Sequence, residues 1–415
     1  MKLGDLIDIK HGFAFSSEYF GPEGPYVLLT PGNFYETGGY KSKSDQKHYD
    51  GPVLEAFVLK PGDLLVAMTE QGEGLLGSAA FVPGGKPCLH NQRLGLVTAK
   101  DGVEVDLSYV YYVLNWRDVR QQIRGSATGA KIRHTSPSRI GAVEIPPHTI
   151  HSQRRIASIL GAYDDLIEVN RRRVAVLEEM ARGLFEEWFV RFRFPGYESV
   201  PLVGTPDAPL PQGWAWGQAK DVIVFDPKTK VPKEADKPFI PMGHLDTVTS
   251  LIASPESRTG NSGAKFRNWD TLFARITPCL ENGKTGLVRD LPGVNGIGFG
   301  STEFIVMRGE RSGPAFTYCL SRLPGFRDHA RSSMSGATGR QRARTESVAT
   351  YAMAIPASDD LFDRFESAAW PMLELVGKLG SMNERLATSR DLLLPRLISG
   401  QLSVEAAERD LELAA

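Results

Sequence analysis

Arginines gather in two places in this sequence. Six basic residues and one acid lie between positions 117 and 139, and six basic residues and one acid lie between positions 322 and 344. Each stretch therefore has a net charge of +5, although the whole chain has 48 Lys and Arg against 49 Asp and Glu, a formal charge of −1. A guanidinium group grips phosphates and guanine edges through a planar fork. Two local basic surfaces predict contact with nucleic acid, and the near-neutral total excludes a histone-like binder.

The side chains in and near these stretches have the chemistry of sequence readout. Asn and Gln amides pair bidentately with adenine, which makes Asn91 and Gln92 candidates for base contacts, while the cations position the backbone or read guanine. A solvated helix face followed by a loop is the alternative for each stretch. The residues expected to bind DNA are Asn91, Gln92, Arg93, Arg124, Lys131, Arg133, Arg139, Arg331, Arg340, Arg342 and Arg344.

Motifs that would build a catalytic or cofactor site are incomplete. Gly72-Glu-Gly-Leu-Leu-Gly77 matches a dinucleotide fingerprint, but the later Pro83-Gly-Gly85 breaks the helix that such a site needs. Asn282-Gly-Lys-Thr285 ends like a phosphate loop, yet Pro278 stands where the leading glycine belongs. Ile145-Pro-Pro-His148 is not the Asn/Asp-Pro-Pro-aromatic tetrad that grips a flipped adenine. The sequence from Gly72 to Gly77 favours a glycine-rich turn between strands.

Histidines and cysteines are too scattered for a metal centre or an activated nucleophile. The eight histidines form no H-E-x-x-H, and Cys88, Cys279 and Cys319 form no C-x-x-C. We therefore expect no catalytic residue, metal or cofactor in this chain. A diverged nuclease or methyltransferase centre is the rival interpretation.

The sequence repeats itself. Within each half, short apolar runs between Gly and Pro turns indicate strands, and the run from Leu107 to Ile123 indicates a helix. We expect an α+β fold of two similar domains. The repeated segments are Thr128-Gly129 and Ile145-Pro146, which return 210 residues later as Thr338-Gly339 and Ile355-Pro356, and Asp63–Ala67, which returns 207 residues later as Asp270–Ala274.

After each half, apolar residues recur at alternating steps of four and three, which predicts a coiled-coil seam on a long helix. We expect the two helices to pair antiparallel, with the domains at opposite ends and an approximate two-fold axis within the chain. Asn170 sets the register or lies on a frayed surface. The seam residues are Ile156, Leu160, Tyr163, Ile167, Asn170, Val174, Leu177, Ala181, Leu184 and Trp188, then Leu361, Phe365, Ala368, Met372, Leu375, Leu379, Met382, Leu386, Ser389 and Leu393.

A chain of 415 residues with 41% hydrophobic and 23% charged residues is long enough for several packed domains. It has neither a membrane-spanning run nor a secretory start, so we expect a cytoplasmic protein. The predicted parts are a first domain at 1–150, a helix at 151–195, a second domain at 196–358, a helix at 359–402 and a tail at 403–415.

The order of these parts resembles the specificity subunit of a type I restriction-modification system, over nearly the whole chain. The resemblance rests on Gly125-Ser-Ala-Thr-Gly129 through Ile145-Pro-Pro147 to Ser152-Gln-Arg-Arg-Ile156, on Gly62-Asp-Leu-Leu65 with Leu76-Gly77, and on the close from Leu392 to Val404. The second half departs from the family pattern, because Ser358-Asp-Asp360 stands where the first half has Ser152-Gln153-Arg154.

The resemblance implies a non-catalytic protein whose two target recognition domains each read one half of a bipartite DNA sequence. Its paired helices would space the domains and dock two modification subunits, which bring S-adenosylmethionine. Restriction subunits that use ATP and Mg would complete the assembly. The alternative from another class is a coiled-coil scaffold that binds protein and does not read DNA.

Overall fold

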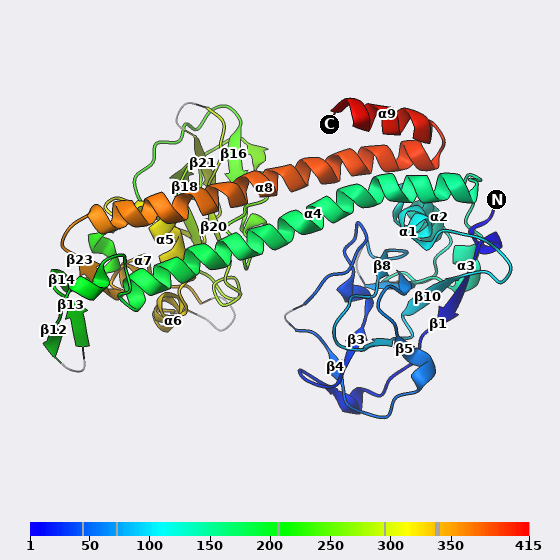
Figure 1. Ribbon diagram of the computed structural model, residues 1–415, viewed down its shortest axis with the longest axis horizontal. Coiled ribbons are helices and arrows are strands. Elements are labelled where there is room, and N and C mark those ends of the chain that lie inside the picture. Colours follow the sequence, from blue (N-terminus) through cyan, green and yellow to red (C-terminus); the bar gives the residue numbers. More distant parts are fainter. Residues whose placement is uncertain (44, 72–73, 206–207, 294–295, 337–340, 415) are drawn as a thin grey trace. The chain divides into compact units, whose positions relative to one another are not determined.

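The computed structural model describes all residues except 44, 72–73, 206–207, 294–295, 337–340 and 415. The chain divides into two units, one made of Met1–Leu166 with Leu386–Ala415 and the other of Ile167–Arg385. Both long helices contribute to both units. Figure 1 labels the elements.

The first unit contains two small sheets. One has the order β1-β10-β6-β8 and the other has the order β2-β4-β3-β9-β5, in which only β3 and β9 run parallel. The strands are β1 (Ile7–His11), β2 (Phe20–Gly21), β3 (Tyr26–Leu29), β4 (His48–Tyr49), β5 (Val58–Leu59), β6 (Leu64–Ala67), β8 (Ala79–Phe81), β9 (Cys88–His90) and β10 (Leu94–Ala99). A separate pair joins β7 (Thr69–Gln71) to β11 (Ile132–His134).

The second unit repeats this topology. Its sheets have the orders β15-β22-β19-β20 and β17-β16-β21-β18, and β16 and β21 are again parallel. The predicted repeat Asp63–Ala67 and Asp270–Ala274 contains β6 and β19, which occupy the same place in the two sheets. The strands are β15 (Ile223–Phe225), β16 (Lys237–Ile240), β17 (Glu256–Arg258), β18 (Ala264–Arg267), β19 (Thr271–Ala274), β20 (Thr285–Leu287), β21 (Ile297–Gly300) and β22 (Phe304–Gly309).

Short helices follow the last strand of the first sheet in both units. The predicted helix from Leu107 to Ile123 is two helices, because Trp116 between them is extended. These helices are α1 (Leu107–Asn115), α2 (Arg117–Gly125) and α3 (Pro137–Gly141), with counterparts α5 (Gly313–Arg322), α6 (Pro324–Ser332) and α7 (Thr345–Ala349). The second unit also has the pairs β12 (Leu202–Thr205) with β13 (Ala208–Pro211) and β14 (Trp214–Gln218) with β23 (Ala352–Pro356).

Two long helices, α4 (Ile150–Phe185) and α8 (Asp360–Ile398), pack antiparallel (Figure 1). A π-helical turn, Glu186–Val190, extends α4. In the second unit Asn170 meets Asn383, and Val174 packs with Leu379. The predicted tail contains a further helix, α9 (Val404–Ala414), whose Glu405 and Glu408 bind Arg155 of α4.

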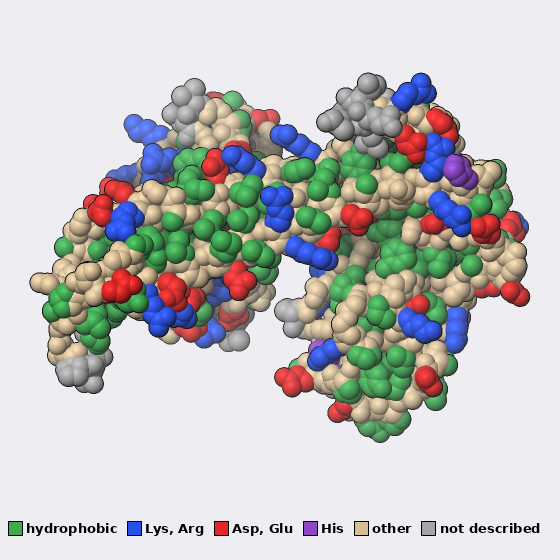
Figure 2. All heavy atoms as spheres, in the orientation of Figure 1, with side chains coloured by type: hydrophobic (Ala, Val, Ile, Leu, Met, Phe, Trp, Pro, Cys, Tyr) green, Lys and Arg blue, Asp and Glu red, His purple; other side chains and the backbone are tan. Residues whose placement is uncertain are grey.

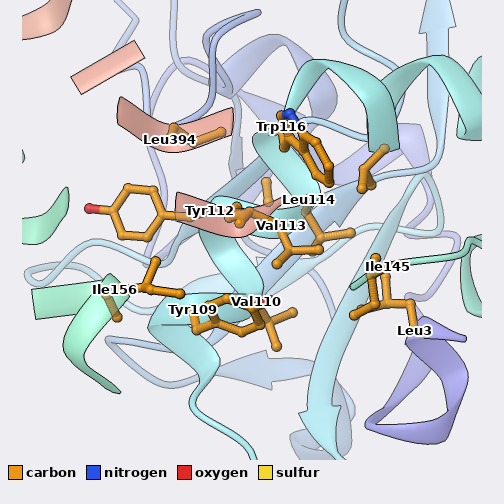
Figure 3. Close-up of a cluster of buried hydrophobic side chains, with 14 of the residues drawn as sticks. Leu3, Tyr109, Val110, Tyr112, Val113, Leu114, Trp116, Ile145, Ile156 and Leu394 are labelled. Carbon is orange, nitrogen blue, oxygen red and sulfur yellow. The ribbon is translucent and has the colours of Figure 1, made fainter. Parts of the chain in front are cut away.

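The core of the first unit joins the domain to both helices. Figure 3 shows Tyr109 and Val110 of α1 beside Ile156 of α4, with Leu394 of α8 near Tyr112. These apolar side chains are buried, and their removal from water ties the helices to the domain. The predicted α+β class with paired long helices is confirmed.

Along half of α8, the side chains that face the core lie one residue after the predicted seam positions. Phe362, Ala369 and Val376 are fully buried, whereas the predicted Met382 is 43% exposed and Ser389 is exposed. Adjacent positions such as Leu361-Phe362 and Leu375-Val376 are both apolar, so the pattern alone did not separate them. The series continues through Asn383 and Arg390, which are half-buried. A search for apolar residues passes over both positions because their side chains are polar. The predicted first-seam residues are all buried or half-buried.

Candidate nucleic-acid interface

In the first unit, the backbone of Met68 is hydrogen-bonded both to Arg93 and to Thr135, which belong to segments that are distant in sequence. We call this arrangement the backbone joint. The Met68 backbone N–H donates to the carbonyl of Arg93 at 2.9 Å, and the Met68 carbonyl accepts from the Thr135 N–H at 2.9 Å. Met68 lies between β6 and β7, so the turn before β10 and the strand β11 both lie against it. The backbone thus brings Gln92 and Arg93 near Lys131 and Arg133, which are far away in sequence.

The side chains at this joint differ in availability. Gln92, Arg93 and Lys131 are exposed and Arg133 is half-buried. Within the described residues, the cationic groups of Arg93, Lys131 and Arg133 have no hydrogen-bond or ion-pair partner. They are therefore placed to contact an anion or a base edge from solvent.

Asn91 is placed for a structural role. Its side chain is only 7% exposed, and its Oδ1 accepts from the Arg93 N–H at 3.0 Å, which holds the turn. A base reader must present both amide groups to a groove, so this placement removes Asn91 from the interface. Residue type alone does not separate the two roles, because an Asn in a tight turn also binds its own backbone.

Other cations of the first stretch hold the neighbouring loop. Arg120 donates to the carbonyl of Leu76 at 2.8 Å, to that of Glu36 at 3.0 Å and to that of Gly74. Arg124 lies 3.6 Å from the buried carboxylate of Glu70. Burial lowers the pKa of Arg120 to about 10, and Glu70 opposes that shift. Part of the predicted basic surface therefore stabilises the protein itself.

Arg139 has a local partner too. Its Nη1 donates to Thr128 Oγ1 at 3.1 Å, across the loop that the backbone pair between Thr128 and His134 closes. On β11, His134 Nδ1 lies 3.1 Å from Thr69 Oγ1. The loop therefore presents Lys131 between fixed ends.

The second unit contains the same backbone joint with different side chains. The Arg275 N–H donates to the carbonyl of Glu303 at 3.0 Å, and the Arg275 carbonyl accepts from the Ala343 N–H at 2.8 Å. Arg275 thus takes the place of Met68, and Glu303 takes that of Arg93. Arg342 takes the place of His134, since Arg342 and Ser335 exchange both backbone hydrogen bonds as His134 and Thr128 do.

This correspondence corrects part of the predicted repeat. Thr128 was matched with Thr338, but the structural counterpart of Thr128 is Ser335. The second loop is one residue longer between its paired ends, so matching letters do not mark matching positions. Thr338, Gly339 and Arg340 lie outside the described residues.

Several arginines of the second stretch are already bound to other groups of the protein. Arg322 is buried and donates to the carbonyls of Thr247 and Gly283 at 3.0 and 2.8 Å. Arg331 pairs with Asp328 at 2.8 Å on its own helix. Arg344 is exposed, and its Nε donates to Ser335 Oγ at 3.3 Å. The equal net charges of the two stretches therefore do not translate into equal basic surfaces.

The described part of the chain holds no group of three or more His, Cys, Asp or Glu that could bind a metal ion. Searching the same residues, we find no helix with the length and apolar character of a membrane span.

Comparison with known proteins identifies a domain in the first part of the chain. Residues 1–179 match the family model of the type I restriction modification DNA specificity domain. The chain carries a type I DNA specificity domain. Similarity to proteins of this kind continues beyond the domain, because the MjaIX specificity subunit of Methanocaldococcus jannaschii is 24% identical over 97% of this chain and 93% of that protein.

Two further comparisons agree with the specificity domain. The EcoAI specificity subunit of Escherichia coli is 32% identical over 34% of this chain and 26% of that protein. A crystal structure of a type I S subunit from M. genitalium shares the fold, with a TM-score of 0.56 and 14% identity over 96% of this chain and 95% of that chain. The recognition of a non-catalytic type I specificity subunit, a class that recognises a DNA target, is confirmed.

Proposed function

We propose that each unit reads one half of a bipartite DNA target through the surface around its backbone joint. The observation that carries the proposal is the repetition of that joint, Met68 in one unit and Arg275 in the other, with exposed cations close to it in the sequence of both units. In the first unit Gln92, Arg93, Lys131 and Arg133 supply the contacts. In the second unit Arg342 and Arg344 supply them.

The two halves of the target differ in sequence. Equivalent positions hold Arg93 and Glu303, or His134 and Arg342, and these side chains offer different hydrogen-bonding groups to base edges. Sequencing methylated adenines in host cells with and without this gene tests the proposal. We expect a two-part, asymmetric motif that disappears with the gene. Binding to DNA without sequence preference would favour the protein-binding scaffold.

We further propose that α4 and α8 set the number of base pairs between the half-sites. Each helix has residues in both units, with the boundaries at Leu166/Ile167 and Arg385/Leu386. Four residues inserted at both boundaries add about 6 Å of helix, close to two base pairs. The expected methylated motif has unchanged half-sites and a spacer longer by about two base pairs. An unchanged spacer would contradict this role. Replacing four residues there without changing the length is the control.

Docking of methyltransferase subunits is proposed for the exposed side of α4. Val169, Val176 and Met180 are exposed, although they recur with the spacing of a buried seam. Figure 2 shows hydrophobic side chains at the surface along the long helices. We expect Val176→Glu with Met180→Glu to lower co-purification of the methyltransferase subunit roughly tenfold or more. The matched control is Glu179→Lys, also exposed on α4, and undiminished co-purification of the double variant would contradict docking at this surface.

A further inference from the structure

Glu303 and Arg342 form an ion pair at the joint of the second unit. Arg342 Nε donates to Glu303 Oε1 and Oε2 at 3.0 and 2.9 Å, and Arg342 Nη2 donates to Oε1 at 2.7 Å. The carboxylate therefore clasps the Nε and Nη2 side of the guanidinium. Three hydrogen bonds fix the plane of the group as well as its position.

The backbone holds both partners. Arg342 exchanges two hydrogen bonds with Ser335, at 3.0 and 3.1 Å, and bridges to Ile276. The carbonyl of Glu303 accepts from Arg275, and the Glu303 N–H donates to Ser301 Oγ at 3.2 Å. A long side chain anchored at both ends loses little further conformational freedom when it binds a ligand.

The pair faces outward through the arginine. The Arg342 side chain is 47% exposed and that of Glu303 is 21% exposed, so the carboxylate lies beneath the guanidinium. Within the described residues Nη1 has no partner. The Nη1 and Nη2 edge, the second fork of the guanidinium, is therefore open to solvent with its donors in a fixed direction.

The charge of Glu303 helps to decide what this open fork binds. A phosphate is an anion, and a carboxylate in direct contact with the arginine repels it and cancels the attracting charge. A base edge is neutral, so the carboxylate costs little there and its fixing of direction is an advantage. The base edge that offers two acceptors to an arginine fork is the O6 and N7 edge of guanine.

We propose that Glu303 is a positioning residue that directs Arg342 to a guanine in the half-site of the second unit. The inference rests on the proposed function and adds the identity of one base, which the proposed function does not specify. The first unit has no such device, because Arg93 stands in place of Glu303 and His134 in place of Arg342. The effect of altering the pair is therefore confined to one half-site.

The test compares Arg342→Ala, Arg342→Lys and Glu303→Gln in the full chain. Methylated adenines are sequenced in cells that carry each variant. The wild-type target and its three single-base replacements at each position then serve as duplex probes for binding by the purified full-length assembly. Asp359→Asn is the matched control, because Asp359 clasps Arg311 through the same Nε and Nη2 side in the same unit.

We expect both Arg342 variants to lower the preference for guanine roughly 10- to 100-fold at one position of one half-site. Lysine keeps the charge and loses the fork. Glu303→Gln lowers the same preference about tenfold, since one acceptor and the charge are lost. The other half-site and the Asp359→Asn control keep the wild-type preferences. Thermal unfolding like that of the wild type shows that each variant is folded.

Other outcomes would overturn the inference while leaving the proposed function intact. Equal weakening on all duplexes, with a flatter salt dependence, would make Arg342 a phosphate contact. Retained guanine preference in Arg342→Lys would show that the guanidinium fork does not read the guanine, and retained preference in Glu303→Gln would show that the carboxylate does not direct Arg342. A wild-type protein without a two-part motif would instead overturn the proposed function.

Discussion

In each unit, a tyrosine at the equivalent helix position donates a hydrogen bond to a carboxylate of a long helix, but the two carboxylates are not equivalent. Tyr112 and Tyr318 are both the sixth residue of their helices, α1 and α5. Tyr112 donates to Asp164 at 2.6 Å, and Arg390 of α8 also binds that carboxylate. Tyr318 donates to Glu178 at 2.7 Å, farther along α4.

The surroundings of the two carboxylates differ more than their partners do. The Asp164 side chain is 29% exposed, whereas Glu178 is 1% exposed and also accepts from the Ser250 N–H at 2.6 Å. Burial raises the pKa of both tyrosines, so each hydroxyl remains a donor. The duplicated domain has kept a buried phenol that needs an acceptor, and each copy satisfies it from a different part of α4.

A second pair of contacts repeats this lesson. Gln153 of α4 accepts from the Asp106 N–H at 3.1 Å, at the start of α1. Glu366 of α8 accepts from the N–H groups of Ala315 and Phe316, at 3.1 and 2.8 Å, at the start of α5. A neutral amide in one unit and a carboxylate in the other thus accept hydrogen bonds from N–H groups at the start of equivalent helices. Only the carboxylate makes the contact sensitive to pH.

The largest predicted effect separates the two tyrosine anchors. Glu178→Ala leaves the Tyr318 hydroxyl and the Ser250 N–H buried without an acceptor, so we expect a loss of about 3–5 kcal/mol in the free energy of unfolding. Asp164→Ala, at a partly hydrated site, should cost about 1–2 kcal/mol. Chemical denaturation and amide hydrogen exchange measure both. Equal losses would mean that burial does not distinguish the anchors.

The next prediction concerns Glu366. Burial raises its pKa to about 7, although the two N–H donors oppose the shift. Between its unfolded pKa of about 4.5 and about 7, the folded state binds more protons than the unfolded state, so stability falls as pH rises. We expect a loss of about 2 kcal/mol from pH 5 to pH 8.

Glu366→Gln should remove that slope, because it copies the neutral amide of the first unit. Thermal unfolding between pH 5 and pH 8 measures the effect, and the variant should exceed the wild type in stability only toward pH 8. Gln153→Glu is the reciprocal variant and should introduce a slope of the same sign. A slope that persists in Glu366→Gln would assign the pH dependence to other groups.

The smallest predicted effect should be shared by both units. Gly77 and Gly283 each have φ near +80° and lie where α2 and α6 pack, so that an added Cβ would meet Ile123 at 2.8 Å or Arg327 at 2.6 Å. We expect Gly77→Ala and Gly283→Ala each to cost about 1–2 kcal/mol, from the left-handed backbone and the contact. Gly62→Ala, also at positive φ but in open space, is a control for the backbone alone. Clearly unequal costs for Gly77 and Gly283 would break the correspondence of these turns.

Much of the scaffold could be predicted from the sequence because its causes are local or periodic. The four-and-three spacing from Ile156 to Trp188 located the first seam, and the repeat around Asp63 and Asp270 located matching strands of matching sheets. The seam of α8 was displaced by one residue where neighbouring positions are both apolar. Its polar members, Asn383 and Arg390, are half-buried, and Asn170 and Asp164 lie opposite them as hydrogen-bonding partners.

The candidate interface was less accessible to sequence reasoning. Counting charge found both arginine stretches but did not separate Lys131, which is exposed to solvent, from Arg120 and Arg322, which bind backbone carbonyls. Glu303 was missed, because an acid is not counted among cations. The backbone joint at Arg275 places Glu303 beside Arg342, and the two side chains form an ion pair.

The sequence by itself determined that there are two copies of one domain, that two long helices pair, and that no familiar catalytic motif is complete. These properties follow from the spacing and the composition of the residues, which can be read directly from the sequence. The tertiary structure decided which cations remain available and which carboxylate each tyrosine uses. Those outcomes depend on contacts between residues as far apart as Tyr318 and Glu178, and no local pattern records whether a polar side chain will find its partner in the protein or in solvent.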